Sequence, residues 1–490
     1  MMNTEKMSLS DHFFYPRSVA VIGVSADENA FGTRYLRALL KFGFKGKLYP
    51  VNPRAGSLLG VKVYPSIGDI PDSVDLVVIS VPGRAVPGVL ESCLPKGIKS
   101  AIVLSAGFSE SGEEGKRLEG ELAKVVTKGI RVIGPNCFGV YCPRGGLTLL
   151  VGPGFPQESG SLGLIAQSGQ FAECIVLQTR GLGIRYSKVI SYGNACDLNE
   201  ADFLEYLSED PDTKVIAAYI EGVKQGRRFL EVVRRTSKVK PVVICKGGLT
   251  STGSRAASSH TGSLAGSEVV WNTFFIQSGA LRVDSTDDLI DSTIAFLHLP
   301  RHCGRRVALV SGSGGSAVIG ADACERSGLE LVPFSTEVQQ KISSLLPPIG
   351  TGVRNPVDLA NPHPSPEVLA AVLEVVAGCD EIDVIILGRM FLSVNGPSLI
   401  VGITKSFEQG REELRDIPLM IKEKFGKPVI VTLSEEVADA EMIEFEGDRR
   451  SLRHYYLTHG IPVYPTLERA VKALTNVLKY QERFDRRDGK

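Results

Sequence analysis

Short apolar runs rich in β-branched residues alternate with longer amphipathic stretches along most of the chain. This alternation is typical of βαβ units, in which helices join buried parallel strands, and it predicts an α/β protein. The expected strands form three successive series. They span 18–23, 47–52, 75–81, 99–105 and 131–134 in the first series, 161–166, 185–191, 214–221 and 240–246 in the second, and 306–311, 329–334, 383–390 and 427–433 in the third.

Segments containing Gly and Pro interrupt the pattern at 145–160 and 299–304. Each series of strands predicts one doubly wound unit, Rossmann-like or flavodoxin-like, with a mainly parallel sheet. The stretch 287–298 is expected to be the last helix of the second unit. The three expected domains are 1–148, 149–300 and 301–490.

The chain has 490 residues, with 55 Lys and Arg against 55 Asp and Glu. This balance gives no sign of a nucleic-acid partner or an acidic membrane surface, so an anionic ligand must be held locally. The nine cysteines contain no C-x-x-C pair, which favours neither disulfides nor a zinc site. No apolar run reaches about eighteen residues, so we expect a cytoplasmic protein without a membrane segment.

The turn after the first expected strand contains Gly23 and Ser25 and leads into a predicted helix. Such a turn presents backbone N–H groups to phosphates. It lacks the G-x-G-x-x-G pattern, and Asn52-Pro53 ends the second strand, where a dinucleotide fold places an acidic residue for the ribose. NAD is therefore disfavoured, and coenzyme A fits these residues better.

Two later turns of the first series also follow strands. They contain Val81-Pro82 and Ser105-Ala106-Gly107. Because the carboxyl ends of parallel strands share one edge of a sheet, both turns are candidates for the same ligand. An ordinary tight turn explains either one taken alone.

In the second series, the turn Gln167-Ser168-Gly169 leaves a strand and enters a helix. The N–H groups near Ser168 and Gly169 are expected to meet a phosphoryl oxygen at the positive end of that helix. Glu221 ends another strand of this series, which predicts a carboxylate at the same edge of the sheet. Without His260 nearby, Glu221 is better explained as an exposed strand end.

His260 lies in a run of small residues shortly after the strand 240–246. Small neighbours such as Gly262 leave the imidazole reachable and let backbone N–H groups approach an anion. This favours a histidine that carries a phosphoryl group, with Glu221 bonding one ring nitrogen while the other acts as nucleophile. A loop histidine with one satisfied ring nitrogen is the alternative, and this window alone leaves both open.

Seven motifs occur along the chain, namely Gly23-x-Ser25, Asn52-Pro53, Ser105-Ala106-Gly107-Phe108, Gly134-Pro135-Asn136-Cys137-Phe138-Gly139, Gln167-Ser168-Gly169, Tyr219-Ile220-Glu221-Gly222 and Ser259-His260-Thr261-Gly262. Over nearly its whole length the chain resembles the NDP-forming acyl-CoA synthetases, in which these motifs follow the same order. The resemblance is to the alpha subunits of the ADP-forming acetyl-CoA synthetases, which are relatives of succinyl-CoA synthetase.

The resemblance implies a reversible reaction in which acyl-CoA, phosphate and ADP give a carboxylic acid, CoA and ATP. It implies that His260 is phosphorylated, that Glu221 supports it and that the turn at Ser168 and Gly169 holds phosphate. The loops of the first domain, with Asn136 and Cys137, would bind CoA. We interpret Cys137 as packing or ligand contact, because nothing in the sequence activates it as a nucleophile.

The resemblance also implies a nucleotide site that the three expected domains do not provide. Family members use an ATP-grasp module, which those with separate subunits carry on a beta chain. We therefore expect an ATP-grasp beta subunit that binds ADP or ATP with Mg²⁺, in an α2β2 assembly. The third domain has a Gly-rich turn with Gly312, Gly314 and Gly315, for which phosphate binding and a structural role stay open.

Other functions compete with this one. A non-catalytic CoA-binding regulatory or scaffold protein would keep the fold, but it has little need of both Glu221 and His260. A serine hydrolase is disfavoured because no G-x-S-x-G occurs. The chain has Ser191-Tyr192-Gly193-Asn194 where family members often have Val-Gly-Asn, a departure that leaves the identity of the small carboxylic acid open.

Overall fold

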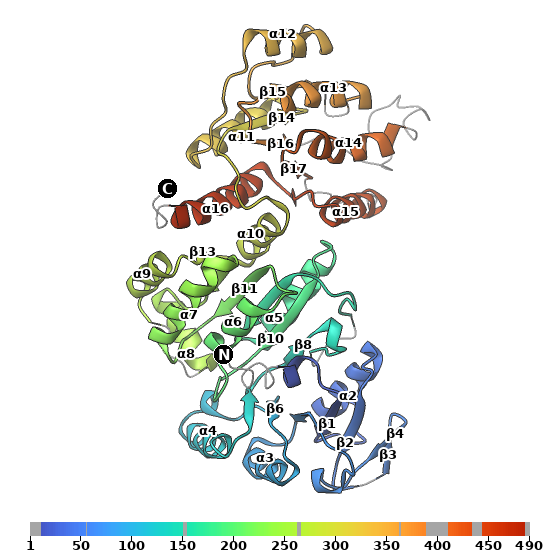
Figure 1. The fold of residues 1–490 in the computed structure, drawn as a ribbon, viewed down its shortest axis with the longest axis vertical. Coiled ribbons are helices and arrows are strands. Elements are labelled where there is room, and N and C mark those ends of the chain that lie inside the picture. The colour runs from blue at the N-terminus through green and yellow to red at the C-terminus, as the bar shows by residue number, and fades with distance from the viewer. Residues whose placement is uncertain are drawn as a thin grey trace, which may run out of the picture. The chain divides into compact units, whose positions relative to one another are not determined.

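The structure, a computed structural model, describes residues 11–54, 56–149, 154–261, 266–361, 364–388, 410–433 and 443–485. It contains two compact units, drawn in blue to green and in yellow to red (Figure 1). The first unit comprises Met1–Arg180 and Arg185–Thr286, and the second comprises Gly181–Ile184 and Asp287–Lys490. No helix of the described part is both long and apolar enough to cross a membrane.

The first unit begins with a parallel five-stranded sheet in the order β2-β1-β5-β6-β7. Strands β1, β5 and β6 are buried along their whole length, as expected for a sheet covered on both faces. The strands are β1 (Ser18–Ile22), β2 (Lys47–Val51), β5 (Leu76–Ile79), β6 (Ser100–Val103) and β7 (Arg131–Ile133). The connections contain α2 (Phe31–Phe42), α3 (Val86–Cys93), α4 (Glu113–Val126), the short turns η1 (Ile67–Asp69), η2 (Gly83–Ala85), η3 (Leu94–Lys96) and η4 (Ser109–Ser111), and a hairpin of β3 (Gly56–Leu58) and β4 (Val61–Val63).

The second sheet of this unit has six strands in the order β13-β12-β11-β9-β10-β8, and only β8 pairs antiparallel. Its strands are β8 (Gly139–Tyr141), β9 (Leu162–Ala166), β10 (Tyr186–Ser191), β11 (Val215–Ile220), β12 (Val242–Lys246) and β13 (Leu281–Val283). Its helices are α5 (Gly169–Arg180), α6 (Glu200–Glu209), α7 (Gly226–Val239), α8 (Ser251–Thr261) and α9 (Glu268–Ser278), with η5 (Pro143–Gly145) before β9.

The second unit contains a parallel sheet in the order β15-β14-β16-β17-β18. Its strands are β14 (Val307–Ser311), β15 (Val357–Asp358), β16 (Val384–Gly388), β17 (Val429–Thr432) and β18 (Val463–Tyr464). Its helices are α10 (Thr286–His298), α11 (Gly314–Arg326), α12 (Thr336–Leu345), α13 (Pro366–Ala377), α14 (Gly410–Phe425), α15 (Ile443–Thr458) and α16 (Leu467–Asp485).

The three sheets share one topology, which confirms the predicted fold class. When the parallel strands of each sheet are numbered along the chain, with β3, β4 and β8 set aside, their order is 2-1-3-4-5 each time. This is the flavodoxin-like arrangement, and its ligand site lies at the carboxyl edge between the first and third strands. In the first unit these edges lie between β1 and β5 and between β9 and β11.

One predicted strand is wrong. The segment 329–334 forms only an isolated bridge between Glu330 and Arg306, and the place beside β14 belongs to β15. The side chain of Asn355 explains the difference, because its Nδ2 donates to the Val307 carbonyl at 2.7 Å and to the Val332 carbonyl at 3.1 Å. An amide side chain thus bonds backbone groups that a strand pair would have joined.

Helix α10 belongs to the second compact unit, whereas the sequence pattern placed 287–298 at the end of the second domain. Its acidic residues pair with basic residues of α16. The Asp291 carboxylate accepts from Arg469 at 2.6 and 2.8 Å, and Asp288 lies 2.6 Å from the Lys472 ammonium. These ion pairs fasten α10 to the last helix of the chain.

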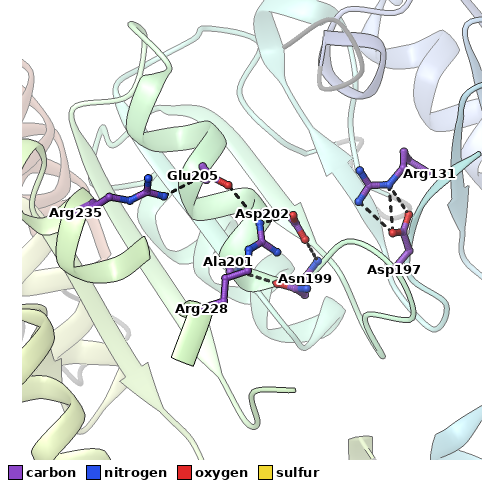
Figure 2. A network of polar contacts seen from close by, with 8 residues as sticks. All are labelled: Arg131, Asp197, Asn199, Ala201, Asp202, Glu205, Arg228 and Arg235. Atoms are coloured by element: carbon purple, nitrogen blue, oxygen red, sulfur yellow. Dashed lines mark hydrogen bonds and ion pairs between the residues drawn. The ribbon is translucent and has the colours of Figure 1, made fainter. Parts of the chain in front are cut away.

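A polar network joins the two sheets of the first unit (Figure 2). Arg131, which begins β7, forms a bidentate ion pair with Asp197, at 2.9 Å for the closest atoms. Asp197 also accepts the Val132 N–H at 2.8 Å. Two residues later, Asn199 caps α6 by accepting the Ala201 N–H at 3.0 Å. The network therefore fixes the loop between β10 and α6 against the first sheet.

Salt bridges extend this network along the surface of α6 (Figure 2). Arg228 of α7 lies 2.7 Å from Asp202 and 3.2 Å from Glu205, and Arg235 lies 2.7 Å from Glu205. These pairs hold α6 and α7 together on one face of the second sheet.

Candidate functional site

Gln167 and Glu221 meet where β9 and β11 end, at the edge that the topology marks for a ligand. The Gln167 Oε1 atom accepts the Glu221 N–H at 2.8 Å and the Gly222 N–H at 3.0 Å. Both side chains are buried, each with 5% exposure. Gln167 therefore uses its carbonyl oxygen to position the backbone that carries Glu221.

The turn at Ser168 and Gly169 starts α5, as the sequence predicts. The Ser168 Oγ atom accepts the Phe171 N–H at 3.3 Å and so caps the first turn of the helix. A Cβ atom on Gly169 would lie 2.6 Å from the Phe138 ring, so only glycine fits there. This packing holds the positive N-terminus of α5 at the same edge as Glu221.

Lys246 is a further buried residue at this edge, for which the sequence gave no role. Its Nζ atom donates to the Glu221 carbonyl at 2.8 Å and to the Gly247 carbonyl, and it lies 4.9 Å from the centre of the Trp271 ring. Burial lowers the pKa of this lysine to about 8. Its position at a strand end is the only sequence signal that points to it.

His260 belongs to α8, so residues 258–261 are helical and do not form a loop. The side chain of His260 and the whole of Gly262 lie outside the described residues. Helix α8 begins a few residues after β12 and lies against η4, the turn that follows Ser105–Gly107. The helix that carries His260 is therefore a neighbour of a loop expected to bind CoA.

The loops that follow β1, β2 and β5 in the first sheet lie close together. Gly23 has φ +95°, and a Cβ atom there would lie 2.1 Å from the Ser80 carbonyl. Asn52 donates from Nδ2 to the Val24 carbonyl at 2.5 Å. The closely packed backbone and the Asn52 hydrogen bond shape these loops for a phosphate-bearing ligand. The loops contain no acidic residue in the position that binds a ribose.

Two hydroxyl groups hold these loops in shape. The Thr33 Oγ1 atom accepts the Ser25 N–H at 2.9 Å and donates to the Ser25 carbonyl at 2.8 Å. The Ser105 hydroxyl donates to the Val81 carbonyl at 2.6 Å, which joins the loops after β5 and β6. The predicted positions Pro53, Pro82 and Ala106 lie in these same loops.

Two backbone amides at the end of the predicted CoA loop 105–107 are already bonded. The N–H groups of Gly107 and Phe108 donate to Glu110 Oε1 at 2.6 and 3.1 Å. Sequence reasoning missed this carboxylate, which is only three residues beyond the loop. Its partners come from the folded turn and from the second sheet, so no local pattern identifies it.

Asn136 and Cys137 take different positions at the end of β7. The Asn136 N–H donates to the Ser105 carbonyl at 2.9 Å, which places it beside the predicted CoA loops. The Cys137 thiol is buried and lies 3.3 Å from the Val103 carbonyl. Burial raises its pKa to about 12, which fits packing and leaves no nucleophile there.

Three protein-family models match consecutive stretches: a CoA binding domain at 17–143, a succinyl-CoA ligase like flavodoxin domain at 159–296 and a ligase-CoA domain at 307–485. The chain is also 36% identical over 482 residues to the alpha subunit of ADP-forming acetate–CoA ligase I from Pyrococcus furiosus, an alignment that covers 97% of this chain and 98% of the relative. The chain belongs to the NDP-forming acyl-CoA synthetase family. The resemblance read from the seven motifs is thereby confirmed.

Two further comparisons support the assignment of this acyl-CoA synthetase chain. ADP-forming acetate–CoA ligase II from Archaeoglobus fulgidus is 36% identical over 96% of this chain, which spans 67% of that relative. The solved structure of dinucleotide forming acetyl-coenzyme A synthetase 1 from Ca. Korarchaeum cryptofilum, in complex with phosphate and ADP, has a TM-score of 0.80. The two chains are 32% identical in sequence, and the match covers 96% of this chain and 97% of the solved chain. The three matched stretches fall inside the three expected domains, whose boundaries stay a prediction.

In the third sheet, the Asp358 carboxylate lies against the Gly-rich turn that follows β14. A Cβ atom on Gly314 would lie 2.6 Å from Asp358 Oδ2, so the side chain of the neighbouring strand lies against the start of α11. Ser311 closes the turn by accepting the Ser313 N–H at 3.3 Å. Gly312 lies in this turn, whereas Gly315 already belongs to the first turn of α11.

Proposed function

We propose that this chain is the alpha subunit of an ADP-forming acyl-CoA synthetase that interconverts acyl-CoA, phosphate and ADP with a carboxylic acid, CoA and ATP. The observation that carries the proposal is the buried edge at which Gln167 and Lys246 fix the backbone of Glu221 beside the N-terminus of α5. The position of α8, which carries His260 and follows the adjacent strand β12, supports this proposal.

In the first step, phosphate attacks the carbonyl carbon of the thioester, and CoA leaves as its thiolate. The products are an acyl phosphate and CoA. We assign the phosphate to the N-terminus of α5 at Ser168 and Gly169, where the helix dipole and the backbone N–H groups of the first turn favour an anion. The pantetheine and phosphates of CoA would lie over the loops at Gly23, Asn52 and Ser105.

In the second step, the neutral imidazole of His260 attacks the phosphorus of the acyl phosphate, and the carboxylate leaves. Glu221 would accept a hydrogen bond from the N–H of one ring nitrogen, which leaves the lone pair of the other nitrogen for attack. The carboxylate also stabilises the positive charge that develops on the ring. The transfer is thereby divided into two steps with good leaving groups.

The third step moves the phosphoryl group from His260 to ADP. We propose that an ATP-grasp beta subunit provides this site together with Mg²⁺, in an α2β2 assembly. Support comes from the Pyrococcus relative, whose name designates it subunit alpha and of which the alignment covers 98%. The comparisons do not favour a non-catalytic CoA-binding protein.

The test is ATP formation from acetyl-CoA, phosphate and ADP by the chain together with its ATP-grasp partner. We expect His260→Ala to lose at least about a thousandfold in kcat, because the proposed covalent intermediate forms on this imidazole. CoA affinity, measured by calorimetry, should stay within about twofold. The control His302→Ala changes an exposed histidine of the second unit and should remain fully active. Undiminished turnover in His260→Ala would contradict the assignment.

A further inference from the structure

The side chain of Asn194 joins the two sheets of the first unit. It lies in the loop after β10 and is 2% exposed. Its Nδ2 atom donates to Glu110 Oε2 at 2.6 Å, to Glu119 Oε2 at 3.1 Å and to the Ser109 hydroxyl at 3.2 Å, while its Oδ1 accepts from Asn136 at 3.4 Å. One buried amide of the second sheet thus binds two carboxylates of the first.

Glu110 divides its two oxygens between the sheets. Oε2 accepts from Asn194, whereas Oε1 accepts the Gly107 and Phe108 N–H groups. Burial alone would raise the pKa of this carboxyl, but the hydrogen bonds from Asn194 and the backbone outweigh it and lower the pKa. The carboxylate is therefore ionised at neutral pH and holds the CoA loop in one conformation.

Glu119 extends the connection to the loop that follows Glu221. Its Oε1 atom lies 3.2 Å from the Lys224 ammonium, which also donates to the Ala195 carbonyl at 3.1 Å. Lys224 is three residues beyond Glu221. A chain of charged hydrogen bonds therefore runs from the CoA loop to the segment that carries the catalytic carboxylate.

The backbone around Asn194 is packed too closely to move independently. Gly193 has φ +57°, and a Cβ atom there would lie 2.1 Å from the Pro135 carbonyl. Helix α8 also lies against η4, the turn that contains Glu110. The Asn194 junction, defined as Asn194, Glu110, Glu119 and Lys224, therefore adjoins all three segments used in the proposed reaction.

We propose that Asn194 and Glu110 are positioning residues that hold the CoA loop in register with the phosphoryl-transfer site, an inference that rests on the proposed function. When CoA lies on the loop at Gly107, the junction fixes its thioester relative to the phosphate at the N-terminus of α5. Attack on the thioester requires such alignment, since small displacements of the reacting atoms cost large factors in rate. Transfer between His260 and the nucleotide uses no CoA and does not need the junction.

The test separates the two half-reactions in the complex with the ATP-grasp partner. Phosphorylation of His260 from labelled phosphate and acetyl-CoA is compared with phosphorylation from labelled ATP. In Glu110→Gln, the amide N–H₂ faces either the Asn194 N–H₂ or the N–H groups of Gly107 and Phe108, so one donor pair is opposed in both orientations. In Asn194→Asp, a carboxylate faces Glu110 and Glu119. For each variant we expect a loss of about ten- to a hundredfold in the acetyl-CoA reaction and less than about threefold in the ATP reaction.

The double variant Glu110→Gln with Asn194→Asp restores a donor and an acceptor with the total charge unchanged. Its loss should be smaller than the product of the two single losses. The control Glu114→Gln alters an exposed carboxylate of α4 that pairs with Arg117, and it should behave as wild type. Equal losses in both half-reactions, or multiplicative losses in the double variant, would show a merely structural role and overturn the inference. A wild-type complex that ATP does not phosphorylate would instead refute the proposed function.

Discussion

Single residues of the site show what a linear pattern can and cannot predict. Gln167 and Glu221 were expected at one sheet edge because both end strands, and the Gln167 Oε1 atom accepts the Glu221 N–H there at 2.8 Å. The hydrogen bonds that the Gln167 side-chain oxygen accepts were not predictable, because the two N–H donors lie more than fifty residues away in sequence. The same is true of Glu110, whose partner Asn194 lies 84 residues away.

Lys188 is a second residue whose role depends on distant partners. It is fully buried in β10, 2.9 Å from Asp210, and its ammonium lies 5.7 Å from the Phe14 ring centre and 5.3 Å from that of Tyr15. Its ion pair and the surrounding rings fasten the start of the chain to the second sheet. In the sequence, Lys188 only interrupts the apolar pattern of the strand. Its role becomes clear from the structure, in which Asp210 lies beside it.

Asp210→Asn removes the counter-charge of Lys188 and leaves a buried cation without its partner. We expect the variant to lose about 3–5 kcal/mol in the free energy of unfolding of the first unit. Asp212→Asn is the matched control, because Asp212 pairs with Arg144 at the surface and should cost less than about 1 kcal/mol. Urea unfolding followed by circular dichroism measures both. Equal losses would contradict the structural role given to Lys188.

At the scale of elements, most long strands were predictable and several short ones were not. Apolar runs located the five strands of the first sheet, including the three-residue β7, but they did not locate β8, β13, β15 and β18, which have only two or three residues each. Such strands carry too few positions for a periodic pattern, and their neighbours in the sheet define them. The segment 329–334 shows the reverse case, because its apolar residues fit a strand while Asn355 takes its hydrogen bonds.

In helix α6, burial and the helix dipole have opposite effects on the pKa of Glu200. Glu200 stands in its first turn with 2% exposure, and its Oε1 atom has no hydrogen-bond partner in the described structure. A carboxylate at a helix N-terminus is normally favourable. Here burial dominates and raises the pKa of Glu200 from 4.5 to about 7.

The raised pKa makes stability depend on pH. Between pH 4.5 and about 7 the folded state binds a proton at Glu200 that the unfolded state lacks, so stability falls as pH rises through this window. Glu200→Gln carries no charge and should gain at most about 3 kcal/mol over wild type above pH 7, with no gain below pH 4.5. Thermal unfolding at pH 4.5 and pH 8 measures the difference. A gain of equal size at both values would contradict this account.

At the scale of the whole molecule, one topology is used three times. Each sheet has the 2-1-3-4-5 order, so each offers a ligand edge at the same place, and the two edges of the first unit carry the predicted CoA and phosphate groups. The alternation of strands and helices made this architecture predictable. How the two sheets of one unit join was not, because Arg131–Asp197 and Asn194–Glu110 are single polar pairs without sequence periodicity.

The central claim is that acyl-CoA and phosphate place a phosphoryl group on His260. The most direct measurement is to incubate the chain, alone and with its ATP-grasp partner, with labelled phosphate and a panel of acyl-CoAs in the absence of nucleotide. The account predicts label that is stable to base and labile to acid, located in the peptide containing Ser259-His260-Thr261 and absent from His260→Ala. Label that persists in that variant, or no label in either preparation while CoA is bound, would contradict the account.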